Sequence, residues 1–144
     1  MSHDPLNTFV GVLTPTVGLR NVGSYQVSGH PFLTGSTLTT GQEFQVDFPF
    51  VTKNITVIAS GTTSTGPVLR VHFNSNTEGN VIGGHHFLTL EASRESATFD
   101  TKCTRLFITC AQSGTGDNGF ELIASLTNIP TGNMYPLTGA GLTV

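Results

Sequence analysis

Large apolar side chains alternate with polar ones between residues 42 and 50, where the sequence reads Gln-Glu-Phe-Gln-Val-Asp-Phe-Pro-Phe. Successive side chains of a β-strand point to opposite faces of a sheet, so this period of two places Phe44, Val46, Phe48 and Phe50 on one face. Similar stretches recur to the end of the chain, and no helical period competes with them. The chain is therefore expected to be all-β.

The strand-like segments are short and are separated by turn residues. They cover residues 19–27, 32–40, 42–50, 54–60, 68–74, 86–92, 97–101, 104–111 and 119–126. In the segment 68–74, the alternation points Leu69, Val71 and Phe73 inward and Arg70 and His72 outward. About eight short strands with regular turns predict a single antiparallel β-sandwich. A jelly-roll-like arrangement is favoured over an immunoglobulin-like one, although the pattern leaves the strand pairing open.

Two apolar segments interrupted by Gly and Pro flank the expected sandwich, which spans residues 19–127. Residues 1–18 are expected to form an extended N-terminal arm and residues 128–144 an extended C-terminal segment. Tails that remain disordered usually lack apolar residues, so both segments are expected to find a surface. Packing on their own domain is one alternative, and contact with a partner or a sister subunit is the other. The candidate contact residues are Phe9, Val10, Leu13, Met134, Tyr135, Leu137 and Leu142.

The charge content excludes some classes of partner. Only 10% of the 144 residues are charged, the formal net charge is −3, and the six cations are scattered along the chain. Nucleic-acid binding needs clustered cations that displace counterions from phosphates, so no direct nucleic-acid ligand is expected. No stretch approaches the roughly 20 apolar residues of a membrane helix, and no export signal is apparent at the N-terminus.

The two cysteines, Cys103 and Cys110, are expected to remain thiols. If residues 103–110 form one strand, the two cysteines lie roughly 23 Å apart on opposite faces. A disulfide needs Cα atoms within about 7 Å of each other. Both cysteines are then small apolar core residues, as expected of a protein that folds in a reducing compartment.

No motif in the sequence carries a catalytic or metal site. Residues 114–119 fit G-x-G-x-x-G, but these glycines lead into a strand rather than a helix, which indicates a hairpin loop. Of the five histidines, His85 and His86 are adjacent and point opposite ways on a strand, and His72 and His86 alone are too few for zinc. The histidines are expected at the surface. A glycosidase pair in space is open to the acids Glu43, Asp47, Glu91, Glu95, Asp100 and Glu121, because sequence spacing cannot exclude it, but a chain with no Trp and two Tyr implies no aromatic-rich cleft. No catalytic residue, metal or cofactor is expected.

Two stretches resemble small virion structural proteins of tailed phages that infect cyanobacteria. The first is Gly-Leu-Arg-Asn-Val-Gly-Ser-Tyr-Gln-Val-Ser-Gly at residues 18–29, followed by Pro-Phe-Leu-Thr-Gly at 31–35. The second is Ile-Pro-Thr-Gly-Asn-Met-Tyr-Pro-Leu-Thr-Gly at residues 129–139. The resemblance implies a non-enzymatic virion component, most plausibly a decoration (cement) protein that bridges capsomers on the head surface after assembly in the bacterial cytoplasm. It also implies the major capsid protein or another virion protein as partner, and a homotrimer as the functional unit.

Two other functions remain open at this level. One is a neck, tail or baseplate component of the same particle. The other is a carbohydrate-binding, receptor-recognition module that uses the loops at residues 74–84 and 113–119. Because the chain has no Trp and only two Tyr, it is poor in the aromatic platforms on which sugar rings stack.

Overall fold

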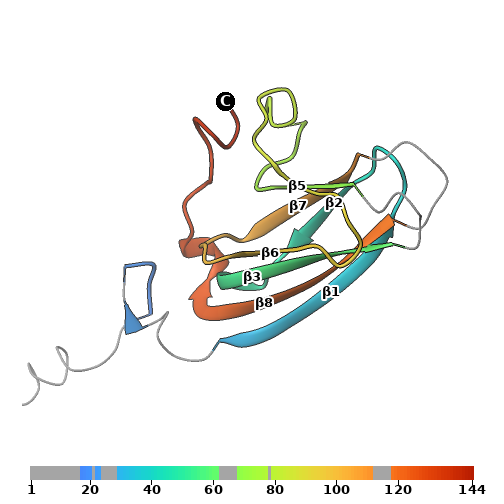
Figure 1. Cartoon of the computed structure of the whole chain (residues 1–144). Coiled ribbons are helices and arrows are strands. Elements are labelled where there is room, and N and C mark those ends of the chain that lie inside the picture. The colour runs from blue at the N-terminus through green and yellow to red at the C-terminus, as the bar shows by residue number, and fades with distance from the viewer. Residues whose placement is uncertain (1–16, 21, 24–28, 62–67, 78, 112–117) are drawn as a thin grey trace, which may run out of the picture.

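Two antiparallel four-stranded sheets pack face to face in the computed structural model (Figure 1). The structure describes residues 17–20, 22–23, 29–61, 68–77, 79–111 and 118–144. One sheet has the strand order β1-β8-β3-β6, and the other has the order β2-β7-β4-β5. We call them sheet A and sheet B. The predicted all-β sandwich is confirmed.

The strands have the following bounds. Sheet A contains β1 (His30–Leu38), β3 (Phe50–Gly61), β6 (Ser96–Phe99) and β8 (Asn118–Pro130). Sheet B contains β2 (Glu43–Asp47), β4 (Leu69–His72), β5 (Leu88–Leu90) and β7 (Arg105–Cys110). A single 3-10 turn, η1 (Thr131–Asn133), follows β8.

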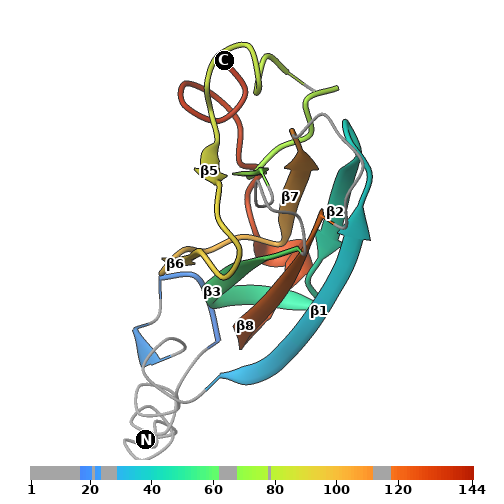
Figure 2. The same cartoon turned by 45° about the vertical axis from the view of Figure 1, so that its right-hand side comes forward.

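The strand pairing is nested along the chain. The first strand pairs with the last, β2 pairs with β7, β3 with β6, and β4 with β5. Two further pairings, β3 with β8 and β4 with β7, join these ribbons into the two sheets. The chain thus folds like one long antiparallel ribbon that crosses repeatedly between the layers (Figure 2).

The core lies between the sheets, where the predicted period of two is confirmed on both central strands of sheet A. On β3, Ile55, Val57 and Ala59 are fully buried. On β8, the buried inward residues are Phe120, Leu122, Ala124 and Leu126. Sheet B contributes Leu69, Val71, Leu106 and Ile108 to the same core. The rings of Phe44 on β2 and Phe120 on β8 meet edge to face across the layers, with centroids 5.3 Å apart.

The segment with the clearest alternation is not one strand. Its first part forms β2, which ends at Asp47, and β3 of the opposite sheet starts at Phe50. Val46 and Phe48 are buried as predicted and Phe44 is half-buried, but Phe50 is 38% exposed and stacks on His30. Pro49 lies at the crossing because a proline has no N–H for a continued ladder.

Other strand predictions differ from the structure at their ends. The weak strand expected at residues 19–27 is absent from the part of this segment that is described, where residues 19, 20 and 22 form turns. β8 continues to Pro130, beyond the predicted end at residue 126 and beyond the predicted domain boundary at 127. Residues 1–16, with the candidate contacts Phe9, Val10 and Leu13, lie outside the described residues, as does most of the glycine loop at residues 114–119.

Candidate functional site

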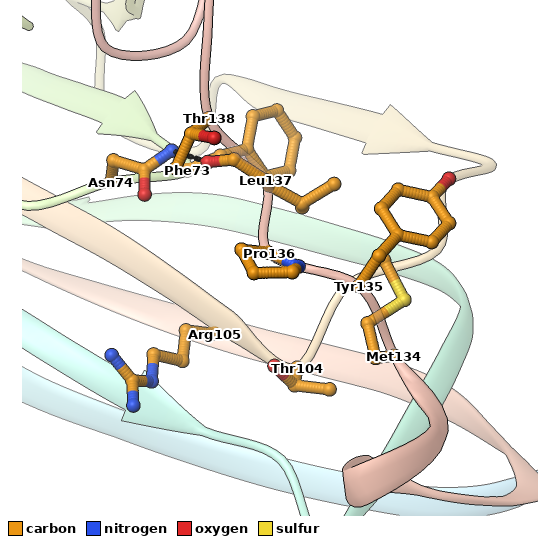
Figure 3. Close-up of a pocket in the computed structure, with 9 residues that line it drawn as sticks. All are labelled: Phe73, Asn74, Thr104, Arg105, Met134, Tyr135, Pro136, Leu137 and Thr138. Carbon is orange, nitrogen blue, oxygen red and sulfur yellow. Dashed lines mark hydrogen bonds between the residues drawn. The ribbon is translucent and has the colours of Figure 1, made fainter.

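The C-terminal segment forms one wall of a groove that is the first of two candidate sites. The groove has a volume of about 280 Å³, and its lining comes from the segment 134–138, from the residues after β4 and from the start of β7 (Figure 3). Three predicted contact residues, Met134, Tyr135 and Leu137, line it together. The fourth, Leu142, lies apart from the groove in a turn that its N–H closes on Gly139 O at 3.0 Å.

The side chains of the groove have different roles. Leu137 packs against the hydrophobic core, whereas Tyr135 is 58% exposed. Figure 3 shows the Tyr135 ring directed away from Asn74 and Arg105, which lie toward the opposite end of the groove. Arg105 is exposed and lies 3.7 Å from an oxygen of Asp47, a pair that water screens strongly. Leu137 therefore anchors the segment and Tyr135 is presented outward.

Hydrogen bonds tie the C-terminal segment to the loop that follows β4. The side-chain amide of Asn74 donates to Leu137 O (Figure 3), and the N–H of Asn80 donates to Thr143 O at 3.1 Å. The segment thus packs on its own domain, which is one of the two alternatives left open by the sequence. Its exposed large apolar side chains, Tyr135 and Val144, still present apolar surface outward.

A buried polar cluster holds the same loop on the outer face of sheet B. His72 is 1% exposed, and its Nδ1 lies 2.7 Å from Asn74 O, to which it must donate because a carbonyl only accepts. Its Nε2 lies 2.8 Å from Thr109 Oγ1, so the neutral imidazole accepts the hydroxyl proton there. The prediction that the histidines lie at the surface is wrong for His72. It points outward from the sheet, but the loop covers it.

Burial lowers the pKa of His72 below its ordinary value of 6.5. The carbonyl of Asn74 and the carboxylate of Glu43, 3.8 Å from Nε2, favour the charged form, and burial outweighs both. His72 is therefore neutral at pH 7, and its approach to Glu43 is not an ion pair. Glu43 instead accepts from Ser75 Oγ at 2.8 Å and from Asn76 N at 3.0 Å, which fixes the loop to β2.

Three other acids lie apart on the surface, each with its own partner. Asp47 lies beside Arg105, Glu121 accepts from Arg94 at 3.2 Å, and Glu95 accepts from the N–H groups of Glu91 and Ala92. No group of three or more potential metal ligands occurs among the described residues. The described part of the chain also contains no helix that is long and apolar enough to cross a membrane.

Both cysteines are unpaired and fully buried in the core. The single-strand placement is wrong for Cys103, because β7 starts two residues later at Arg105. Both side chains belong to the same core cluster rather than to opposite faces of the sheet. Burial raises the pKa of Cys103 to about 11, and its sulfur lies 3.4 Å from Thr52 Oγ1.

A second surface feature was not identified from the sequence. Leu33 on β1 and Ile123 on β8 are directly paired across the strands on the outer face of sheet A, and they are 74% and 45% exposed. With Ile58 of β3 they line a shallow apolar depression. The alternation of β8 contained a sign of this feature, because its outward position 123 is an isoleucine rather than a polar residue. We call Leu33, Ile58 and Ile123 the sheet A patch.

Comparison of the chain with protein-family models and with curated proteins finds no match.

Proposed function

We propose that this chain is a non-enzymatic structural protein of a viral particle, and specifically a decoration protein that bridges capsomers on the head of a tailed phage. The observation that carries the proposal is the sheet A patch. Its exposed leucine and isoleucine are held side by side on a rigid sheet. Such a surface suits contact with another protein better than it suits chemistry.

The surroundings of the patch support a contact role. Hydroxyl side chains flank it, and Thr56 and Thr98 share a hydrogen bond of 3.0 Å across β3 and β6. The carboxylate of Glu121 borders the patch and is neutralised by Arg94. A neutral surface of this kind avoids the cost of desolvating unpaired charges on association.

The fold also supports the proposal. We infer that the sandwich is of the jelly-roll class, since a jelly roll is a double-sheet sandwich of eight strands and the nested pairing supports that wiring. The class occurs in viral capsid proteins and also in lectins, so the fold alone does not separate structural from sugar-binding roles. The proposed partner is the major capsid protein or another virion protein, and the proposed unit is a homotrimer.

Imaging intact particles by cryo-electron microscopy tests the proposal directly. Density for this sandwich on the head surface, at positions between capsomers, is the expected result. Density confined to the neck, tail or baseplate would instead identify the protein as a component of that part of the particle. Absence of the sandwich from purified particles would overturn both.

A co-sedimentation experiment tests whether the sheet A patch contacts the phage head. Heads that lack the protein are sedimented with wild-type protein, with Ile123→Lys and with Thr37→Lys. Thr37 is also exposed on sheet A but lies away from the patch, so it provides a matched control. Loss of co-sedimentation is expected for Ile123→Lys alone.

One observation favours the carbohydrate-binding alternative. Tyr135 is an exposed aromatic ring beside the groove that also contains the Asn74 amide and the Arg105 guanidinium. An exposed ring with polar groups nearby is suited to the apolar face and hydroxyls of a sugar. Binding on a glycan array that Tyr135→Ala abolishes would establish this role.

A further inference from the structure

The sandwich is open along one side, where the edge strands β5 and β6 of the two sheets face each other. A hollow of about 330 Å³ lies between them. Its lining is mainly apolar and also includes two histidines and a glycine: Val71, Phe73, Phe87, Leu88 and Phe99, with His85, His86 and Gly141. We call this hollow the β5–β6 mouth. Val71 belongs to the buried core, so the mouth leads directly to the interior.

The mouth leaves apolar side chains in contact with water. Leu88 lies in register with the core residue Val71, yet it is 52% exposed. Phe73 and Phe99 meet edge to face with centroids 6.1 Å apart and are only half-buried. Covering these three side chains would remove apolar area from water and would stabilise whatever conformation supplies the cover.

The N-terminal part of the described chain contacts the segment that follows β6, one of the two strands that border this mouth. The side-chain ammonium of Lys102 donates to Leu19 O at 2.9 Å, and Lys102 follows Phe99 by three positions. Figure 2 draws the short blue segment next to β6, in line with this hydrogen bond. The sixteen residues before Val17 therefore join the described chain on the side of the molecule where β6 ends.

The segment before Val17 is long enough and apolar enough to cover the β5–β6 mouth. The eight residues from Val17 back to Phe9 span up to roughly 26 Å when extended. No charged residue occurs from Pro5 to Thr16, and the apolar residues of this stretch are Leu6, Phe9, Val10, Val12 and Leu13. Burying such a segment incurs no cost of desolvating a charge.

We propose that residues 6–13 dock in the β5–β6 mouth of their own subunit. A segment tethered this close to its site has a high effective concentration there, which favours the same copy over a neighbouring one. The proposal gives Phe9, Val10 and Leu13 an intramolecular site in place of a contact with a partner. It is independent of the proposed role in a viral particle.

Paramagnetic relaxation in the full-length chain tests the docking. A spin label is attached at Asn7→Cys, a polar position within the segment, while the native thiols stay unlabelled because both are fully buried. Amide signals of residues 87–90 and 96–99 are expected to lose most of their intensity. Signals of residues 33–35 and 121–123, on the outer face of sheet A, are expected to keep theirs.

Two charge substitutions and a mixing experiment complete the test. Leu88→Lys is expected to restore the broadened signals, whereas Leu33→Lys, at a more exposed leucine on the other sheet, is expected to leave them broadened. In a mixture of isotope-labelled chains without the spin label and spin-labelled chains without isotope, no broadening is expected. Three results would each overturn the proposal. They are uniform broadening of the amide signals, restoration of the signals by Leu33→Lys but not by Leu88→Lys, and broadening in the mixture.

Discussion

The imidazole Nε2 of His72 and the hydroxyl of Thr109 lie 2.8 Å apart on adjacent strands of sheet B, beneath the loop that follows β4. The other ring nitrogen, Nδ1, donates a hydrogen bond to the backbone carbonyl of Asn74 in that loop. The side-chain amide of Asn74 in turn donates to the carbonyl of Leu137. One buried histidine thus connects the sheet, the loop and the C-terminal segment. The position of the C-terminal segment, which forms one wall of the groove, depends on these hydrogen bonds.

The stability of the protein should fall in mild acid because of His72. Burial lowers the pKa of His72 in the folded state, so below about pH 6.5 the unfolded chain binds a proton that the folded chain resists. Its contribution to the free energy of unfolding is complete above that pH and decreases as the pH falls from 6.5 toward the lowered folded pKa. Urea unfolding between pH 5 and 7.5 measures the effect. The variant His72→Gln should show a smaller slope over the same range, and an unchanged slope would assign the effect to other groups.

Both thiols should resist alkylation in the folded protein. The raised pKa of Cys103, about 11, leaves almost no thiolate at neutral pH, and both cysteines are fully buried. Mass spectrometry after iodoacetamide treatment should show no modification of the native protein and two modifications per unreduced chain after denaturation. Rapid labelling under native conditions would indicate that the core around Cys103 opens.

Removing the amide of Asn74 should loosen the C-terminal segment without unfolding the sandwich. Asn74→Ala leaves the Leu137 carbonyl without its donor, and the loss of such a bond costs about 1 kcal/mol of unfolding free energy. Hydrogen exchange should accelerate at residues 139–144 and remain slow on β3 and β8. Tyr135→Phe, which removes only an exposed hydroxyl, is the control and should leave exchange unchanged.

Truncation at the centre of the core should be far more costly than truncation of the sheet A patch. Ile55→Ala removes a fully buried side chain from β3 and should destabilise the fold by about 2–5 kcal/mol. Leu33→Ala, at a position 74% exposed, should change stability by no more than about 0.5 kcal/mol. Denaturant midpoints measure both. A large loss for Leu33→Ala would show that the patch contributes to folding rather than to contact.

The alternation of side chains was sufficient to predict the all-β class and the inward faces of the central strands. Ile55, Val57 and Ala59 on β3, like Leu69 and Val71 on β4, follow the period of two because sheet geometry imposes it locally. The same alternation misled at Pro49. It continues through Phe48 and Phe50, but it carries no information on which sheet each residue joins.

The sequence by itself determined which residues are apolar and how they alternate, and with them the all-β class, the layered architecture and the inward faces of the central strands. The tertiary structure alone decided which outward-facing residues are buried and which apolar residues remain exposed. His72 points outward yet is covered, because a loop distant from β2 and β7 in the chain folds across the sheet and bonds Glu43. Leu33 and Ile123 form a patch only because β1 and β8, the first and last strands, pair in register. Such neighbours are set by long-range pairing, which a local period of side chains does not encode.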